Sequence, residues 1–232
     1  MRTIGLIGGM SWESTVLYYQ WINRGVRGRL GPLSSARLLL DSLDFAAIEV
    51  LQRQGDWTRA GEVLAASARR LEAGGAECIV LATNTMHKVA DAIVQATPLP
   101  FLHIADATGA AIGAAGIRTV ALLGTAFTME EDFYRGRLRD AFGIRCVVPP
   151  ADVRREVHRI IYEELCAGVV SERSRAFFRA VMAACVVDGA QGIILGCTEI
   201  GLLVGPQDSV VPLFDTAALH AAAAVDFSLA GA

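Results

Sequence analysis

The sequence predicts an α/β fold of two duplicated, pseudo-symmetric lobes, each with three layers around a mostly parallel sheet. Three observations lead to this prediction. Short apolar runs alternate with longer segments of helical period, the alternation restarts half-way along the chain, and polar residues follow two corresponding apolar runs. Alternating strands and helices are typical of parallel sheets, whose ligands bind beyond the carboxyl ends of the strands. We therefore expect the active site in a cleft between the lobes.

Composition limits the class of protein. Hydrophobic residues make up 53% of the 232 residues and charged residues 19%, which excludes intrinsic disorder. The net charge of -3, without a basic stripe, argues against a nucleic-acid partner. The five cysteines form no C-x-x-C pair, so reduced thiols in the cytoplasm are expected rather than a zinc ribbon or disulfide framework. The apolar N-terminal run stops at Trp12, too early for a signal peptide or membrane span.

The first lobe is predicted over residues 1–112. Apolar, β-rich runs indicate its strands, and segments of helical period between them indicate its helices. The expected strands are Thr3–Ile7, Arg37–Leu40, Cys78–Leu81 and Phe101–Ile104, and the expected helices are Ser14–Gly25, Trp57–Ala73 and Thr85–Val94.

The second lobe is predicted over residues 113–214, with residues 215–232 packing back on the first. Thr128 and Glu131 are read as a capping box that opens a helix. The expected strands are Thr119–Leu123, Cys146–Val148, Ile193–Leu195 and Val211–Phe214, and the expected helices lie around Met129–Phe142, Asp152–Ala167, Glu172–Val187 and Thr216–Leu229.

The restart of the pattern predicts a duplication. Three pairs of segments match in the same order and at nearly constant separation. They are Gly75-Ala-Glu-Cys-Ile-Val-Leu with Gly189-Ala-Gln-Gly-Ile-Ile-Leu, Thr3-Ile-Gly-Leu-Ile-Gly with Thr119-Val-Ala-Leu-Leu-Gly, and Pro100-Phe-Leu with Pro212-Leu-Phe. Chance likeness between buried parallel strands, which are all rich in Val, Ile and Leu, is the alternative.

The duplication relates two polar segments that follow strands. Thr83-Asn84-Thr85 comes after one strand and Cys197-Thr198-Glu199 after its counterpart, so Cys197 maps onto Thr83. If the lobes are related by a pseudo-two-fold axis, these two side chains face each other. Such a pair suits stereoinversion at one carbon, because one group removes a proton and the other delivers a proton to the opposite face.

Each candidate residue also has a structural interpretation. The helix N-terminus after Cys197 is expected to lower the pKa of its thiol, whereas the alternative is a buried, inert cysteine, as we read Cys78 and Cys185. The polar residues of 83–85, and likewise Thr125 and Thr128, either bind ligand or cap helices. The turn Gly8-Gly9-Met10-Ser11 either binds a carboxylate through backbone N–H groups or is purely structural. The four histidines show no metal spacing.

No cofactor is expected. The chain has no G-x-x-x-x-G-K-[ST] phosphate loop, and its glycines do not form a G-x-G-x-x-G dinucleotide motif. Pyridoxal phosphate needs a lysine, and Lys88 is the only lysine among 21 Lys and Arg residues. Its position on a predicted helix past Thr83 argues against that role.

Five segments together resemble the aspartate/glutamate racemase family, in particular its L-aspartate/glutamate-specific branch. They are Gly-Gly-Met-Ser-Trp-Glu-Ser (8–14), Thr-Asn-Thr-Met-His-Lys (83–88), His-Ile-Ala-Asp-Ala-Thr (103–108), Leu-Gly-Thr-Ala-Phe-Thr-Met (123–129) and Gly-Cys-Thr-Glu-Ile-Gly-Leu-Leu (196–203). The resemblance implies cofactor-independent racemisation by two opposed acid/base residues. Family members usually carry cysteine at both positions, but Thr83 stands here at the first. The implied substrate contacts are Met10, Gln52, Asn84, Thr85 and Thr198, together with Thr125, Thr128 and Glu199.

The resemblance leads to a specific hypothesis. Cys197 as thiolate abstracts the α-proton of an L-amino acid, and Thr83 or its bound water reprotonates the other face. A single-cysteine decarboxylase of malonate type, a racemase of other amino-acid specificity, and an amino-acid-binding protein without turnover are the alternatives. A small-molecule amino-acid substrate, no membrane partner and a homodimer are expected.

Overall fold

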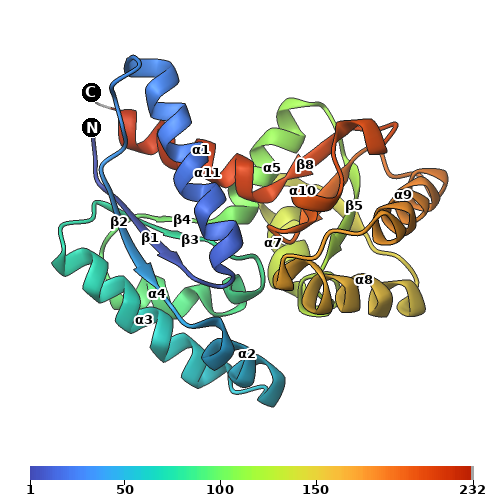
Figure 1. Ribbon diagram of the computed structural model, residues 1–232, viewed down its shortest axis with the longest axis horizontal. Helices are drawn as coiled ribbons and strands as arrows, with labels where there is room; N and C mark the ends of the chain where they lie inside the picture. The colour runs from blue at the N-terminus through green and yellow to red at the C-terminus, as the bar shows by residue number, and fades with distance from the viewer. Residues whose placement is uncertain (231–232) are drawn as a thin grey trace. The chain divides into compact units, whose positions relative to one another are not determined.

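The computed structural model describes residues 1–230 and confirms the α/β fold, with two four-stranded parallel sheets (Figure 1). The first sheet has the strand order β2-β1-β3-β4 and the second the order β6-β5-β7-β8. Every strand pair is parallel, so in each sheet the carboxyl ends of the strands share one edge.

The chain forms two compact units. The first comprises Met1–His103 and the chain from His220 onward, and the second comprises Ile104–Leu219. The division differs from the expected ranges 1–112 and 113–214 at α5 (Ile104–Ala114), which contacts α7 (Asp132–Phe142) and β8 (Leu213–Asp215) of the second unit.

The first unit is built around β1 and β3, whose side chains are all buried. Helix α3 packs against β1, β2 and α4, and Figure 1 shows α1 on the other side of this sheet. The elements are β1 (Ile4–Gly8), α1 (Trp12–Leu30), β2 (Leu38–Ser42), α2 (Phe45–Gln54), α3 (Trp57–Ala73), β3 (Cys78–Leu81), the 3-10 helix η1 (Thr85–Val89), α4 (Ala90–Ala96) and β4 (Phe101–Leu102).

The second unit repeats this plan. Helices α8 and α9 contact β5, whereas α7 contacts β6 and α5 contacts β8. Besides α5, α7 and β8, the elements are β5 (Thr119–Gly124), α6 (Ala126–Glu130), β6 (Arg145–Val147), α8 (Ala151–Glu163), η2 (Leu165–Ala167), α9 (Glu172–Val187), β7 (Ile193–Gly196), α10 (Ile200–Leu203) and η3 (Pro206–Asp208). The last helix, α11 (Thr216–Leu229), begins in the second unit and continues into the first from His220.

The two sheets have the same register as well as the same strand order. Ile7 of β1 pairs with Leu81 of β3, and Leu123 of β5 pairs with Leu195 of β7. These are the pairs that the sequence repeat relates to each other, as a duplicated unit predicts. Thr83 and Cys197 therefore follow equivalent strands at equivalent positions.

The predicted capping box at Thr128 and Glu131 is wrong. Thr125 caps α6 instead, because its side chain accepts a hydrogen bond from the backbone N–H of Thr128. Glu131 precedes α7 as its N-cap and makes no side-chain capping bond. The expected helix Met129–Phe142 is therefore two helices, α6 and α7, that meet at Glu131.

The turn after β1 depends on glycine. Gly9 has φ +86°, and a Cβ atom there would lie 2.1 Å from the carbonyl oxygen of Leu43. Gly75 has a similar φ of +91°, but a Cβ atom there would meet nothing within 4 Å. The two glycines thus separate the cost of a positive φ from the cost of a steric clash.

We expect Gly75→Ala to lower the free energy of unfolding by about 1–2 kcal/mol, the usual cost of left-handed backbone for a residue with Cβ. Gly9→Ala adds a clash with backbone and is expected to cost more than about 4 kcal/mol. Urea unfolding of both variants measures the difference. Equal losses would contradict the close contact between Gly9 and Leu43.

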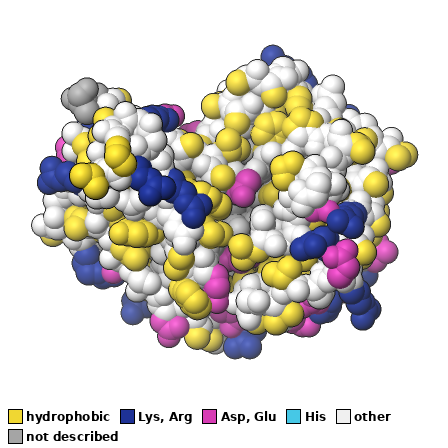
Figure 2. Space-filling model, turned by 45° about the horizontal axis from the view of Figure 1, so that its top comes forward, with side chains coloured by type: hydrophobic (Ala, Val, Ile, Leu, Met, Phe, Trp, Pro, Cys, Tyr) yellow, Lys and Arg dark blue, Asp and Glu magenta, His cyan; other side chains and the backbone are white. Residues whose placement is uncertain are grey.

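No helix among residues 1–230 is both long and apolar enough to cross a membrane. Figure 2 shows that both basic and acidic side chains occur on the face that it draws.

Candidate active-site residues

Cys197 follows the last residue of β7 and lies against a carboxylate. Its Sγ donates a hydrogen bond to Oε2 of Glu199 over 2.9 Å. The same Oε2 accepts a hydrogen bond from the hydroxyl of Thr198 at 2.7 Å. All three side chains are buried. A thiol and a hydroxyl therefore converge on one carboxylate oxygen, an arrangement in which a proton can pass between sulfur and oxygen.

The pKa of the Cys197 thiol is raised well above its ordinary value, so the expectation of a lowered pKa is wrong. Burial is the largest cause, because it disfavours the thiolate, and the negative charge of Glu199 is the next. The following helix α10 is only four residues long, which leaves little helix dipole to oppose these effects. Cys197 is thus a protonated thiol beside a base.

Thr125 and Thr128 lie in the same unit, after the neighbouring strand β5. Their hydroxyl oxygens are 3.1 Å apart, and both side chains are buried. A Cβ atom on Gly196 would lie 3.5 Å from Cγ2 of Thr128, so this threonine packs on the residue before Cys197. Capping of α6 occupies Thr125, as the structural interpretation expects.

In the first unit, Thr83 follows β3 and begins the polar segment 83–85. The side chains of Thr83, Asn84 and Thr85 are buried, with exposed fractions of 8%, 3% and 5%. Asn84 is the N-cap residue of η1, and its side chain makes no capping hydrogen bond. Capping of η1 by the Asn84 side chain, one structural alternative for this segment, is therefore absent.

Met10 and Gln52 also belong to the first unit. Met10 lies in the apolar core cluster of that unit, in the turn after β1. Gln52 is buried on α2, and its Nε2 lies 3.1 Å from Sδ of Met86. The backbone N–H of Gly9 donates to the hydroxyl of Thr15 at 2.8 Å, so this donor of the turn already has a partner inside the protein.

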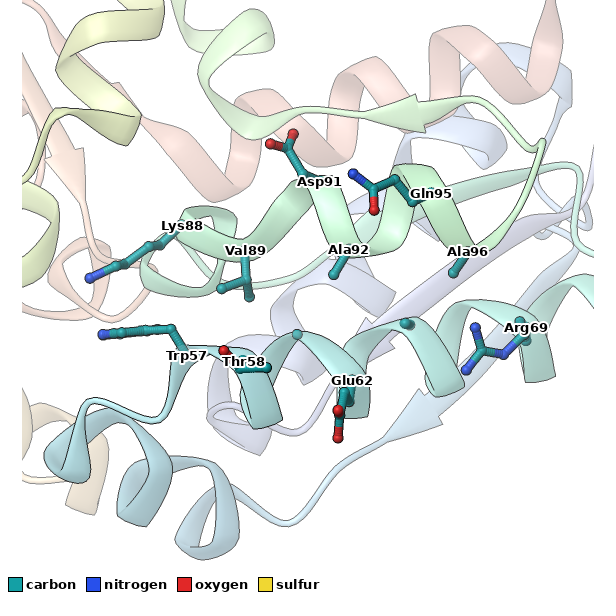
Figure 3. A pocket seen from close by; sticks show the side chains of 12 residues that line it. Trp57, Thr58, Glu62, Arg69, Lys88, Val89, Asp91, Ala92, Gln95 and Ala96 are labelled. Atoms are coloured by element: carbon teal, nitrogen blue, oxygen red, sulfur yellow. The ribbon is translucent and has the colours of Figure 1, made fainter.

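Lys88 lies on the indole ring of Trp57. Its Nζ is 3.9 Å from the ring centroid, a cation–π contact. The two side chains lie together at one end of a groove of about 520 Å³ between α3 and the segment of η1 and α4, and Arg69 lies toward the other end (Figure 3). The only lysine of the chain is therefore part of a groove wall between helices.

The sequence did not reveal two contacts of the candidate residues. Glu199 was expected as a substrate contact, but its carboxylate binds the Cys197 thiol; its position two residues after the cysteine was the available signal. The ring of His87 contacts the backbone carbonyl of Thr83, and no pattern in the sequence indicated this contact. No group of three His, Cys, Asp or Glu side chains within residues 1–230 is arranged to hold a metal ion.

Comparisons with known proteins identify the family of this chain. A family profile described as Asp/Glu/Hydantoin racemase matches residues 7–224. A Yersinia pestis structure provisionally assigned as an Asp/Glu racemase has 55% identity and a TM-score of 0.92, and the match covers 99% of this chain and 100% of that chain. An aspartate racemase homologue from Pyrococcus horikoshii OT3 has 34% identity and a TM-score of 0.85, with coverage of 98% and 99%.

A more distant structure, unliganded arylmalonate decarboxylase, shares the fold at 17% identity and a TM-score of 0.54, with coverage of 100% and 95%. The family profile spans nearly the whole chain, and both closer structures carry racemase descriptions. The chain therefore belongs to the Asp/Glu/Hydantoin racemase family.

Proposed function

We propose that the protein racemises acidic amino acids, L-aspartate and L-glutamate, without pyridoxal phosphate. Cys197 and Thr83 act on opposite faces of the α-carbon. The observation that carries the proposal is the Cys197–Glu199 hydrogen bond at a position equivalent to that of Thr83 in a duplicated fold. The proposal includes the assumption that the two residues face each other across a cleft.

The reaction begins with transfer of the thiol proton of Cys197 to Glu199. The resulting thiolate removes the α-proton of the L-enantiomer, and the electron pair passes into the substrate carboxylate as an enediolate. The hydroxyl of Thr83, or a water that it holds, then protonates the opposite face. A threonine hydroxyl is far less acidic than a thiol, so it suits donation to a strong carbanion better than proton removal.

Substrate binding is assigned to polar groups around the two strand ends. Asn84 and Thr85 in the first unit and Thr128 in the second supply amide and hydroxyl groups for carboxylate oxygens. Thr198, whose hydroxyl donates to Glu199, belongs to the set as the neighbour of Cys197. Met10 and Gln52 complete the set in the first unit, and Thr125 in the second. Glu199 serves the thiol in this proposal.

Thr83→Val tests the role of the hydroxyl, because valine keeps the branched shape and removes the donor. We expect the variant to exchange the α-proton of L-aspartate in D₂O but to form D-aspartate about 10²-fold more slowly than wild type. Thr83→Ser is the matched control and should retain most of the inversion. Chiral chromatography measures both variants. Unchanged inversion by Thr83→Val would remove Thr83 from the mechanism.

The presence of threonine in place of a second thiol favours one further candidate, a decarboxylase for substituted malonates. There, Cys197 would protonate the enediolate left after loss of carbon dioxide. The two reactions differ in their products. Release of carbon dioxide from a substituted malonate, without racemisation of aspartate or glutamate, would replace the racemase proposal with this one.

A further inference from the structure

Both backbone polar groups of Thr83, its N–H and its carbonyl, form hydrogen bonds within the first unit. Its N–H donates to the carbonyl of Leu81 over 2.9 Å. Its carbonyl oxygen lies 2.7 Å from Nδ1 of His87. These two bonds fix the peptide units before and after Thr83, so they set the direction of the Cα–Cβ bond that carries its hydroxyl.

The second bond defines the tautomer of His87. A carbonyl oxygen only accepts hydrogen bonds, so Nδ1 of His87 carries the proton and donates it to Thr83. In the neutral ring Nε2 is then the acceptor nitrogen. The backbone N–H of His87 also bonds to this segment: it donates to the carbonyl of Asn84 over 3.1 Å.

Neighbouring rings hold the imidazole of His87 in place. His87 is 3% exposed, and its ring centroid lies 4.5 Å from that of His103 and 5.5 Å from that of Phe101. His220, at 6.0 Å, is itself fixed by a 2.7 Å contact between its Nε2 and the carbonyl of Leu102. In a close-packed cluster the ring cannot turn away from Thr83 without displacing its neighbours.

The second unit holds Cys197 differently. The repeat places Gly201 at the position of His87, so no side chain is present there to bind the Cys197 carbonyl. That carbonyl accepts a hydrogen bond from the backbone N–H of Ile200 at 3.1 Å, and Glu199 contacts the thiol. The contact between an imidazole ring and the backbone carbonyl is thus present at Thr83 in the first unit and has no counterpart at Cys197 in the second.

We propose that His87 is a positioning residue for racemisation, which holds the Thr83 carbonyl through Nδ1–H and so aims the Thr83 hydroxyl at the substrate. The inference rests on the proposed role of Thr83. Proton removal by Cys197 does not depend on this bond, whereas reprotonation from the opposite face does. Loss of the bond should therefore separate α-proton exchange from inversion.

Two substitutions test the position of the donor nitrogen. The amide nitrogen of asparagine is attached to Cγ, like Nδ1 of histidine, whereas that of glutamine is one atom farther away, like Nε2. We expect His87→Asn to keep inversion of L-aspartate within about three-fold of wild type. His87→Gln should keep α-proton exchange in D₂O but lose about ten-fold to a hundred-fold in inversion.

The ratio of inversion to exchange decides the outcome. An equal ratio in wild type and both variants would overturn the inference, as would a parallel loss of exchange, inversion and thermal stability, which would make His87 only structural. Nitrogen-15 NMR of the wild-type imidazole gives a second readout: we expect protonation at Nδ1, and a ring protonated only at Nε2 would contradict it. If wild type exchanges no α-proton of any acidic amino acid, the proposed function itself fails.

Discussion

Cys197→Ser is expected to lower kcat for L-aspartate and L-glutamate by about 10²–10⁴-fold, the range associated with loss of a positioned acid or base. Serine can still donate a hydrogen bond to Glu199, so the local contacts survive. Its hydroxyl does not ionise at accessible pH, and the group that removes the α-proton is lost. The rate of change of optical rotation measures the effect.

Cys185→Ser is the matched control for this variant. Cys185 is also a buried thiol of the second unit, but it lies on α9 and no candidate residue contacts it among the interactions described. We expect near-normal kcat from the control. Cys197→Ser enzyme that retained more than about a tenth of wild-type kcat would show that this thiol is not the base.

Glu199→Gln is expected to change two properties in opposite directions. The negative charge of Glu199 and its hydrogen bond from the thiol both raise the pKa of Cys197. Neutral glutamine removes the charge and leaves only a weaker acceptor for the thiol, so the pKa falls and the thiolate fraction at a given pH rises. Alkylation by iodoacetamide at fixed pH should therefore become faster, while kcat for racemisation falls about ten-fold to a thousand-fold, because the acceptor of the thiol proton is gone.

The direction of the kcat change is decisive for Glu199. If alkylation and racemisation both become faster, Glu199 only suppresses the thiolate and is not the base of the proposed first step. Glu62→Gln is a suitable control, since it removes an exposed carboxylate that pairs with Arg59 on α3. Exposed ion pairs contribute little, and both rates should stay unchanged there.

The fold was predictable because local patterns and the repeat agree. The strand Cys78–Leu81 and the helices Trp57–Ala73 and Glu172–Val187 have the predicted bounds, since each apolar pattern ends at clear breaks in the sequence. Helix α5 was missed because its segment is rich in alanine and glycine and follows β4 almost directly. Helix α2, capped by Asp44, was not among the expected helices.

The sequence indicates candidate site residues but not their electrostatics. The repeat related Thr83 to Cys197 without any knowledge of contacts. The pKa of Cys197, however, depends on burial and on the folding back of the Glu199 side chain. The tie between His87 and the Thr83 carbonyl likewise depends on loop geometry, which a residue pattern does not contain.

Proton NMR of wild type in D₂O tests the central claim most directly. With wild type, L-aspartate and L-glutamate should lose their α-proton signal and their optical rotation together. With Cys197→Ser, both signals should persist over the same time. That result would establish racemisation through Cys197. Persistence of the α-proton in both substrates and their D-enantiomers with folded wild-type enzyme would contradict the proposal that this protein racemises acidic amino acids.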